Sequence, residues 1–165
     1  QSRKIYEDEQ VLAVLDINPA NPGHALLLTK EHYSIMPQLS EEDVAHVFIV
    51  AKSLSNCMLR SIDAQGTNLI VANGIAAGQR AQHFMVHIVP RKENDGVDFV
   101  LPQKTIEEKE IEAIGGKLIA VLSGAVEKEE KSEPLKIKEP KKKEEPKKSK
   151  SSVNLDDISK FLGAK

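Results

Sequence analysis

Apolar residues occur along the chain in five short runs and two longer periodic stretches. Aliphatic and β-branched residues dominate the short runs, and Asn, Asp, Pro or Gly separate several of them, which is typical of β-strands. We therefore predict five strands: Lys4–Tyr6, Val11–Ile17, Ala25–Thr29, Asn68–Ala72 and Gln82–Val89.

The two longer stretches carry apolar residues three to four positions apart, which indicates helices. Ser40 followed by Asp43 predicts an N-cap and an amphipathic helix of about twenty residues after it. A second helix is predicted over Thr105–Leu122, where Gly115–Gly116 lowers helix propensity by about 1 kcal/mol per glycine and allows a break or close packing. Because strands and helices do not alternate regularly, we predict an α+β fold with a five-stranded antiparallel sheet and two helices on one face.

Composition changes abruptly near residue 126. Residues 1–126 hold 11 basic and 16 acidic side chains, whereas the remainder holds 12 and 9. Residues 127–152 consist mainly of Lys, Glu and Pro and cannot bury enough surface to offset their ordering entropy, so we predict a disordered linker. Within residues 153–165 an amphipathic segment is predicted, because four apolar residues share one helical side: Leu155, Ile158, Phe161 and Leu162. The expected domains are thus 1–126, 127–152 and 153–165.

Several classes of protein are excluded by composition. No apolar run reaches the ~18–20 residues of a membrane span, and no secretory signal opens the chain. Cys57 is the only cysteine, so a disulfide scaffold is excluded and a reducing, cytoplasmic location is expected. The mixed charge of the tail argues against nucleic-acid binding, although residues 141–143 and 147–150 could contact polyanions at low salt.

Candidate chemistry lies on the last predicted strand. Alternate residues of a strand face the same side, so His83, Met85 and His87 share one face, while the intervening apolar residues face the core. Taken alone, the two histidines are typical of a half-buried structural pair. A second segment, residues 16–32, changes this interpretation.

Together the two segments resemble the histidine triad (HIT) superfamily. The family pattern of three histidines alternating with apolar residues, then Pro-Arg, reads here His83-Phe-Met85-Val-His87-Ile-Val-Pro-Arg91, after the pair Gly78-Gln79. Upstream, the family's Asp and Pro-x-x-Pro-Gly-His turn correspond to Asp16 and to residues 19–24, and its Pro-Lys-x-His corresponds to residues 29–32. The resemblance covers Arg3–Asp98, about three-fifths of the chain.

This resemblance implies a homodimer in which two five-stranded sheets join into one ten-stranded sheet. It also implies that each protomer binds a purine nucleotide such as AMP. Family members hydrolyse or transfer nucleoside phosphates, phosphoramidates or dinucleoside polyphosphates. In that chemistry the middle histidine attacks the α-phosphorus and forms a nucleotidyl-histidine intermediate.

Carried over residue by residue, the resemblance assigns a nucleotide site. Asp16 would hold the ribose hydroxyls, with Leu15 and Ile17 beside the base, although Asp16 could instead be an ordinary turn residue. The phosphate contacts would come from Asn73, Gly78 and Gln79. The side chains that would complete the phosphate site and its chemistry are His83, His87, His24 and Gln79.

One departure from the family pattern decides the functional question, because Met85 occupies the middle triad position. A thioether forms no phosphoryl adduct comparable to that of imidazole. Neighbouring positions on the same face of a strand lie about 6.6 Å apart, so His83 or His87 cannot simply replace it. We therefore expect nucleotide binding with reduced or altered hydrolase or transferase activity.

Two alternatives remain. The chain is an active phosphoramidate or dinucleoside polyphosphate hydrolase that uses His87, His83 or an activated water, or it is an adaptor that acts through residues 153–165. We expect no metal. Some relatives build a zinc site from an N-terminal Cys pair and histidines at the positions of His32 and His83. A zinc site is expected here only if such a Cys pair precedes Gln1. Cys57 is expected in the core.

Overall fold

The computed structural model describes residues 2–125 of the 165-residue chain. Described residues up to 97 form one compact unit, and residues 98–125 belong to a second unit. The predictions for residues 127–152 and 153–165 lie outside the described residues. No helix in the described range is both long and apolar enough to cross a membrane.

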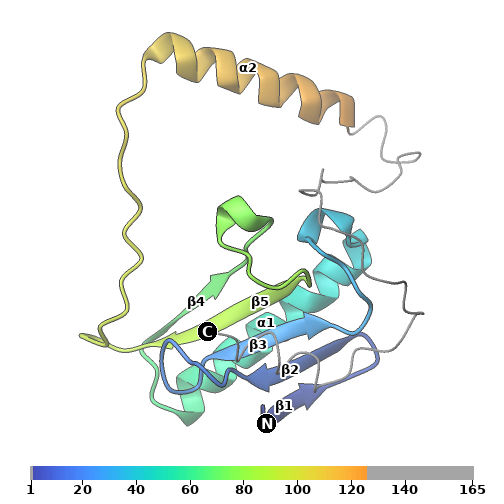
Figure 1. The fold of residues 1–165 in the computed structure, drawn as a ribbon, viewed down its shortest axis with the longest axis vertical. Coiled ribbons are helices and arrows are strands. Elements are labelled where there is room, and N and C mark those ends of the chain that lie inside the picture. Colours follow the sequence, from blue (N-terminus) through green and yellow to red (C-terminus); the bar gives the residue numbers. More distant parts are fainter. Residues whose placement is uncertain (1, 126–165) are drawn as a thin grey trace, which may run out of the picture. The chain divides into compact units, whose positions relative to one another are not determined.

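The first unit is built on a five-stranded antiparallel sheet with the strand order β1-β2-β3-β5-β4 (Figure 1). The strands are β1 Lys4–Glu7, β2 Val11–Leu15, β3 Ala25–Thr29, β4 Gly66–Ile70 and β5 Met85–Arg91. The α+β class, the antiparallel sheet and the two helices are confirmed. The homodimer stays a prediction.

Most strand ends differ from the expectation by one to three residues. β2 stops at Leu15 instead of Ile17, because the Asp16 carboxylate accepts the N–H of Asn18 at 2.9 Å and starts a turn. β4 begins and ends two residues earlier than expected, with Gly66 paired to Arg91. Only the bounds of β3 agree with the expectation at both ends.

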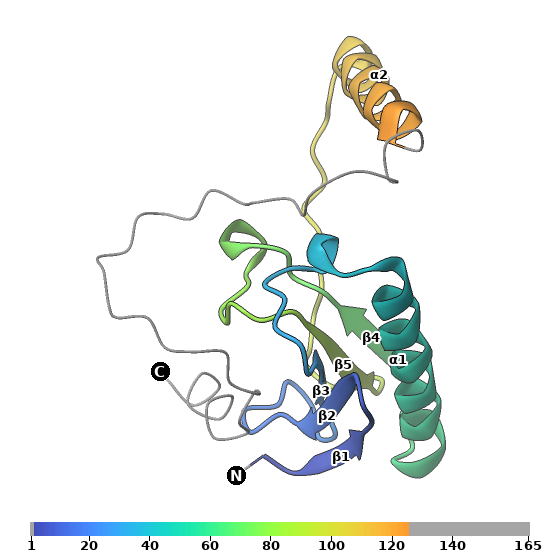
Figure 2. The ribbon, with the colours of Figure 1, turned by 90° about the vertical axis from the view of Figure 1, so that its right-hand side faces the viewer.

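Helix α1, Glu41–Ser61, covers one face of the sheet (Figure 2). It begins as predicted, with the Ser40 side chain accepting the N–H of Asp43. Its apolar side packs with inward residues of the sheet into the main core, which includes Val11, Leu27, Val47, Ala51, Phe84 and Val86. Cys57 is exposed on this helix rather than buried, so its predicted core position is wrong; the apolar side of α1 passes instead through Val50, Leu54 and Met58.

The opposite face of the sheet carries a second apolar cluster formed by Leu12, Val14, Leu26 and Leu28, with Met85 packed against it. In the antiparallel register, Met85 lies opposite Leu28 and His87 opposite Leu26. Residues two apart on a strand share a face, so Met85 and His87 both belong to this side. The candidate site is therefore on the face that α1 does not cover.

Helix α2, Glu108–Ala125, belongs to the second unit. It starts three residues later than expected and continues through Gly115–Gly116 without a break. A Cβ on either glycine would have nothing within 4 Å, so neither glycine serves close packing in the described residues. The predicted position of this helix on the sheet stays a prediction.

Candidate active site

Strand β5 begins at Met85, so the prediction that it starts at Gln82 is wrong by three residues. The last ladder pair with β3 joins Leu28 and Met85. Beyond it, the His83 ring rather than a backbone group reaches β3, with its Nε2 2.9 Å from the carbonyl oxygen of Thr29. Phe84 is anchored by its N–H, which donates to the carbonyl of Tyr33 at 2.6 Å.

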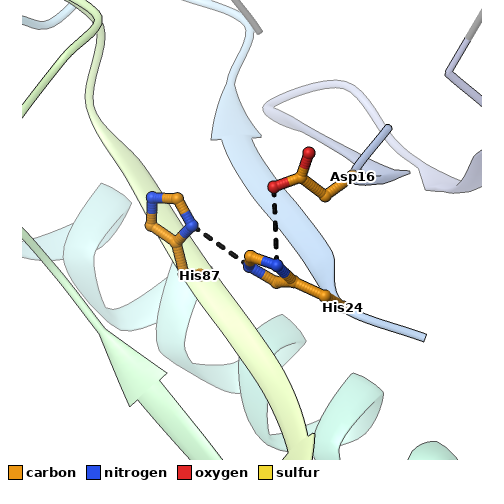
Figure 3. Close-up of side chains that lie close together, drawn as sticks. All are labelled: Asp16, His24 and His87. Atoms are coloured by element: carbon orange, nitrogen blue, oxygen red, sulfur yellow. Dashed lines mark hydrogen bonds and ion pairs between the residues drawn. The ribbon is translucent and has the colours of Figure 1, made fainter. Parts of the chain in front are cut away.

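Asp16, His24 and His87 meet on the uncovered face of the sheet (Figure 3). His24 Nε2 lies 3.1 Å from His87 Nδ1, and His24 Nδ1 lies 3.4 Å from the Asp16 carboxylate. Asp16 directly follows β2, His24 directly precedes β3, and His87 lies within β5. Sequence positions far apart are thus joined into one polar chain with His24 in its centre.

Burial determines the charge of these imidazoles. The His24 side chain is 7% exposed and the Asp16 side chain 9%. Desolvation lowers the pKa of His24, against the smaller opposing effect of the Asp16 charge. Desolvation likewise lowers the pKa of His87, so both rings favour the neutral form at neutral pH.

A second histidine pair lies at the entry to β5. His32 Nδ1 and His83 Nδ1 are 3.0 Å apart, and the ring centroids are separated by 5.1 Å. Burial also lowers the pKa of His83, whereas His32 lies at the exposed surface. Nothing acidic bonds to either ring in the described residues, which distinguishes this pair from the one beside Asp16.

The predicted phosphate-contacting residues lie in the loop between β4 and β5. Asn73 is exposed, and its Oδ1 accepts the N–H of Met36 at 2.9 Å. Gly78 has φ +87°, a conformation that favours glycine, and it ends the short turn 75–77. The Gln79 side chain accepts from Gly74 N and donates to the Ser34 carbonyl, so this amide holds the loop in shape.

The two residues expected beside the base differ in exposure. Leu15, at the end of β2, is half-buried, whereas Ile17 is 40% exposed. Met85 is half-buried and packs against the second apolar cluster, on the same face as His87.

Asp95, which no sequence pattern singled out, holds the turn before His24. The Asp95 carboxylate accepts from the Asn21 side chain at 2.7 Å and from the Arg91 guanidinium at 2.7 and 2.9 Å. Arg91 holds the pKa of Asp95 well below its usual range. The Asn21 amide also donates to the carbonyl of Pro90. The turn carrying His24 is thereby fastened to the end of β5.

Metal binding at the two histidine pairs depends on how their ring nitrogens are arranged. One ligand atom from each of Asp16, His24 and His87 lies within 4.8 Å of the others, but His24 stands between its neighbours and turns a different ring nitrogen to each. That order suits a hydrogen-bonded chain better than three ligands around one ion. His32 and His83 supply two ligands, and the only cysteine is Cys57 on α1, so the residues present do not fit the zinc site of the resembling proteins.

Comparison with known proteins gives a consistent result. The HIT domain family matches residues 1–94. An uncharacterized HIT-like protein of Methanocaldococcus jannaschii is 39% identical over 95 residues, which cover 58% of this chain and 73% of that protein. The adenosine 5'-monophosphoramidase hnt1 of Schizosaccharomyces pombe is 34% identical over 116 residues, covering 70% of this chain and 84% of that protein.

Among solved structures, the protein SMU.412c of Streptococcus mutans superposes with a TM-score of 0.69 at 31% identity, covering 74% of this chain and 78% of that one. Sequence and fold therefore agree over the unit that carries the two histidine pairs. The chain belongs to the HIT domain family.

Proposed function

We propose that this chain binds a purine nucleoside phosphate on the uncovered face of the sheet and that Met85 removes the covalent route of catalysis. The observation that carries the proposal is the Asp16–His24–His87 chain beside Met85 on the same face. A carboxylate acceptor and imidazoles next to apolar surface match the polar and apolar parts of a nucleotide. One relative, hnt1 of Schizosaccharomyces pombe, is named as an adenosine 5'-monophosphoramidase.

In this proposal Asp16 holds the ribose, and Leu15 and Ile17 line the base. The ribose hydroxyls donate to the carboxylate oxygen that faces His24, since its other oxygen already accepts from Asn18. Ile17 is 40% exposed, and covering it by a purine would remove apolar surface from water.

The phosphate would be held by the loop between β4 and β5 together with His83 and His87. Asn73 uses its Oδ1 for Met36, and no described residue bonds to the two N–H donors of its amide, which are proposed to bind an anion. Gly78 and Gln79 are proposed to bring the backbone close to the phosphate, with the Gln79 side chain holding the loop.

Met85 stands where the resemblance requires the nucleophile. A methionine sulfur offers no stable, hydrolysable phosphoryl adduct, whereas an imidazole does. His87 lies two residues further along the strand, about 6.6 Å away, while attack requires about 3–3.5 Å. Binding is therefore retained more fully than covalent turnover.

Calorimetric titration of the full chain with AMP tests the proposal. We expect a micromolar-range Kd at pH 7.5 and slow or undetectable turnover of adenosine phosphoramidate and diadenosine polyphosphate. No binding of AMP, ADP or GMP would contradict it. Turnover at the rate of a histidine-containing relative would contradict the role assigned to Met85.

The homodimer is proposed to form along the β4 edge of the sheet. β4 is an edge strand of the sheet formed by the described residues, and its Leu69 is 44% exposed. Ile49 on α1, the helix that contacts β4, is 63% exposed. Sedimentation should show a dimer that Leu69→Lys weakens. The matched substitution Ile5→Lys on β1, at the opposite edge, should leave it intact; equal effects would exclude the β4 edge.

A further inference from the structure

The two histidine pairs pose a question about where their protons lie. A neutral imidazole carries one N–H and one lone pair, and its function depends on which nitrogen holds the proton. In a contact between two ring nitrogens one must donate and the other accept. A backbone group that can only donate, or only accept, therefore determines the tautomer of a whole pair.

A backbone carbonyl determines the tautomers of the pair at the entry to β5, His32 and His83. The Thr29 oxygen can only accept, so His83 donates to it through Nε2–H at 2.9 Å. The Nδ1 of His83 then carries the lone pair, and His32 must donate its Nδ1–H across the 3.0 Å contact. Nε2 of His32, to which no residue in the described range bonds, is left with a lone pair.

A backbone amide determines the tautomers of the pair beside Asp16, His24 and His87. The N–H of Ala20 can only donate, and it points at His24 Nδ1 across 3.2 Å. His24 therefore carries its proton on Nε2 and donates it to Nδ1 of His87, 3.1 Å away. The proton of His87 is left on Nε2.

The Asp16 carboxylate competes with the Ala20 amide for His24 Nδ1, because a carboxylate would favour a proton on that nitrogen. That proton would point directly at the Ala20 N–H. The carboxylate lies 3.4 Å from Nδ1, longer than an ordinary hydrogen bond, and already accepts from Asn18. The backbone donor cannot turn away, whereas the carboxylate has another partner.

The outward nitrogen of His87 is available to a ligand. No described residue bonds to its Nε2. The only buried side-chain nitrogen or oxygen without a partner in the described residues is Ser2 Oγ, so His87 Nε2 is not sealed inside the protein. Burial of the ring lowers its pKa, which agrees with a neutral imidazole.

We propose that the Ala20 amide, acting through His24, fixes His87 in the Nε2–H tautomer, so that the free nitrogen donates a hydrogen bond to an anionic oxygen such as that of a phosphoryl group. His24 is a positioning residue in this arrangement. His87 then cannot act as a base toward water without first giving up that proton. The tautomer assignment is independent of the proposed function, whereas the choice of phosphate as ligand rests on it.

Ring 15N shifts of the full chain at pH 7.5, with each histidine assigned by substitution, test the tautomers directly. We expect the proton on Nε2 for His24, His83 and His87 and on Nδ1 for His32. A proton on Nδ1 of His87 would overturn the proposal. His46, whose Nε2 contacts the Asp8 carboxylate at 2.8 Å, is the internal reference for an Nε2–H ring.

Two substitutions test whether Ala20 or Asp16 determines the tautomers of His24 and His87. Asp16→Ala should leave the protons of His24 and His87 in place, because the amide remains. Ala20→Pro removes the amide proton and should move both protons to Nδ1, provided that the spectrum shows a folded chain. A changed tautomer in Asp16→Ala would overturn the proposal even if the proline variant fails to fold.

AMP titration of His24 variants then tests the donor role. The amide of His24→Gln can still donate to His87 Nδ1 and should keep the affinity within about twofold, while His24→Leu should weaken it about tenfold. Equal loss in both would overturn the positioning role. If no protein form binds AMP but the shifts agree, the tautomer assignment stands and the proposed function fails.

Discussion

The two histidine pairs, His24–His87 and His32–His83, are nearly identical in composition and spacing, yet they present opposite chemistry. Their ring centroids are 5.3 and 5.1 Å apart, and their nitrogen contacts are 3.1 and 3.0 Å. In the first pair His24 accepts a backbone N–H, and in the second pair His83 contacts a backbone carbonyl. The comparison teaches that the fixed backbone group beside a pair, rather than the histidines themselves, decides whether a donor or a lone pair faces outward.

In the sequence, Met85 lies between His83 and His87, which are one member of each pair. It packs against the second apolar cluster on the same face as His87. An imidazole there would give the face a nucleophile between the two pairs. In the proposed function, the thioether leaves groups that bind and orient a nucleotide on this face but no nucleophile at position 85.

The largest expected effect comes from Met85→His, which should restore that nucleophile. Loss of a covalent nucleophile commonly removes several orders of magnitude in rate, so the variant alone should accumulate an AMP adduct after mixing with adenosine phosphoramidate. Intact-protein mass spectrometry detects the adduct. Met85→Leu is the matched control and should form none. An adduct on the unsubstituted chain would show that another side chain attacks.

The next effect sharpens the difference between the pairs. His87→Ala should weaken AMP binding about tenfold or more, because a hydrogen bond to a charged phosphate contributes about 1.5–3 kcal/mol. His32→Ala, in the other pair, should change the affinity less than twofold. Calorimetry measures both values. Equal losses would mean that the two pairs contribute alike and that the distinction fails.

A smaller effect is expected from the turn that carries His24. Gly23 has φ +93°, and a Cβ there would lie 2.6 Å from Ile62 Cδ1 and 3.3 Å from Pro90 Cγ. Gly23→Ala should lower the free energy of unfolding by about 1–3 kcal/mol through backbone strain and crowding.

Gly78→Ala is the control for this substitution, since φ is +87° and nothing lies within 4 Å of the added Cβ. Urea unfolding of the two variants separates crowding from strain. An equal loss of stability would show that only the positive φ matters. The His24–His87 ring shifts should change in Gly23→Ala and not in Gly78→Ala.

The smallest effect is the pH dependence of stability. Burial lowers the pKa of His24, His83 and His87 in the folded chain, so the unfolded chain binds more protons below about pH 6.5. The free energy of unfolding should therefore fall as pH decreases from 7.5 to 5.5. His87→Gln should flatten this slope. Carboxylates affect stability at lower pH than the histidines do, since Lys30 and Lys4 hold the pKa of Glu7 at about 2.

Much of the fold could be predicted from local patterns. The strand over Ala25–Thr29 and the start of α1 at Ser40 agree with the expectation, because alternation, helical spacing and an N-cap are local signals. Strand ends were less accurate where a side chain replaced a ladder bond, as Asp16 does after β2 and the His83 ring does before β5. The exposure of Cys57 depended on the rotation of α1, which its composition does not specify.

By itself, the sequence determined the family and the order of the strands along the chain. Only the tertiary structure decided that Ala20 faces His24, that Thr29 faces His83, and that Asp95 fastens the turn before His24. The physical reason is that backbone donors and acceptors are the same in every residue. Which of them meets a given side chain is set by how distant segments pack, and that contact places the proton.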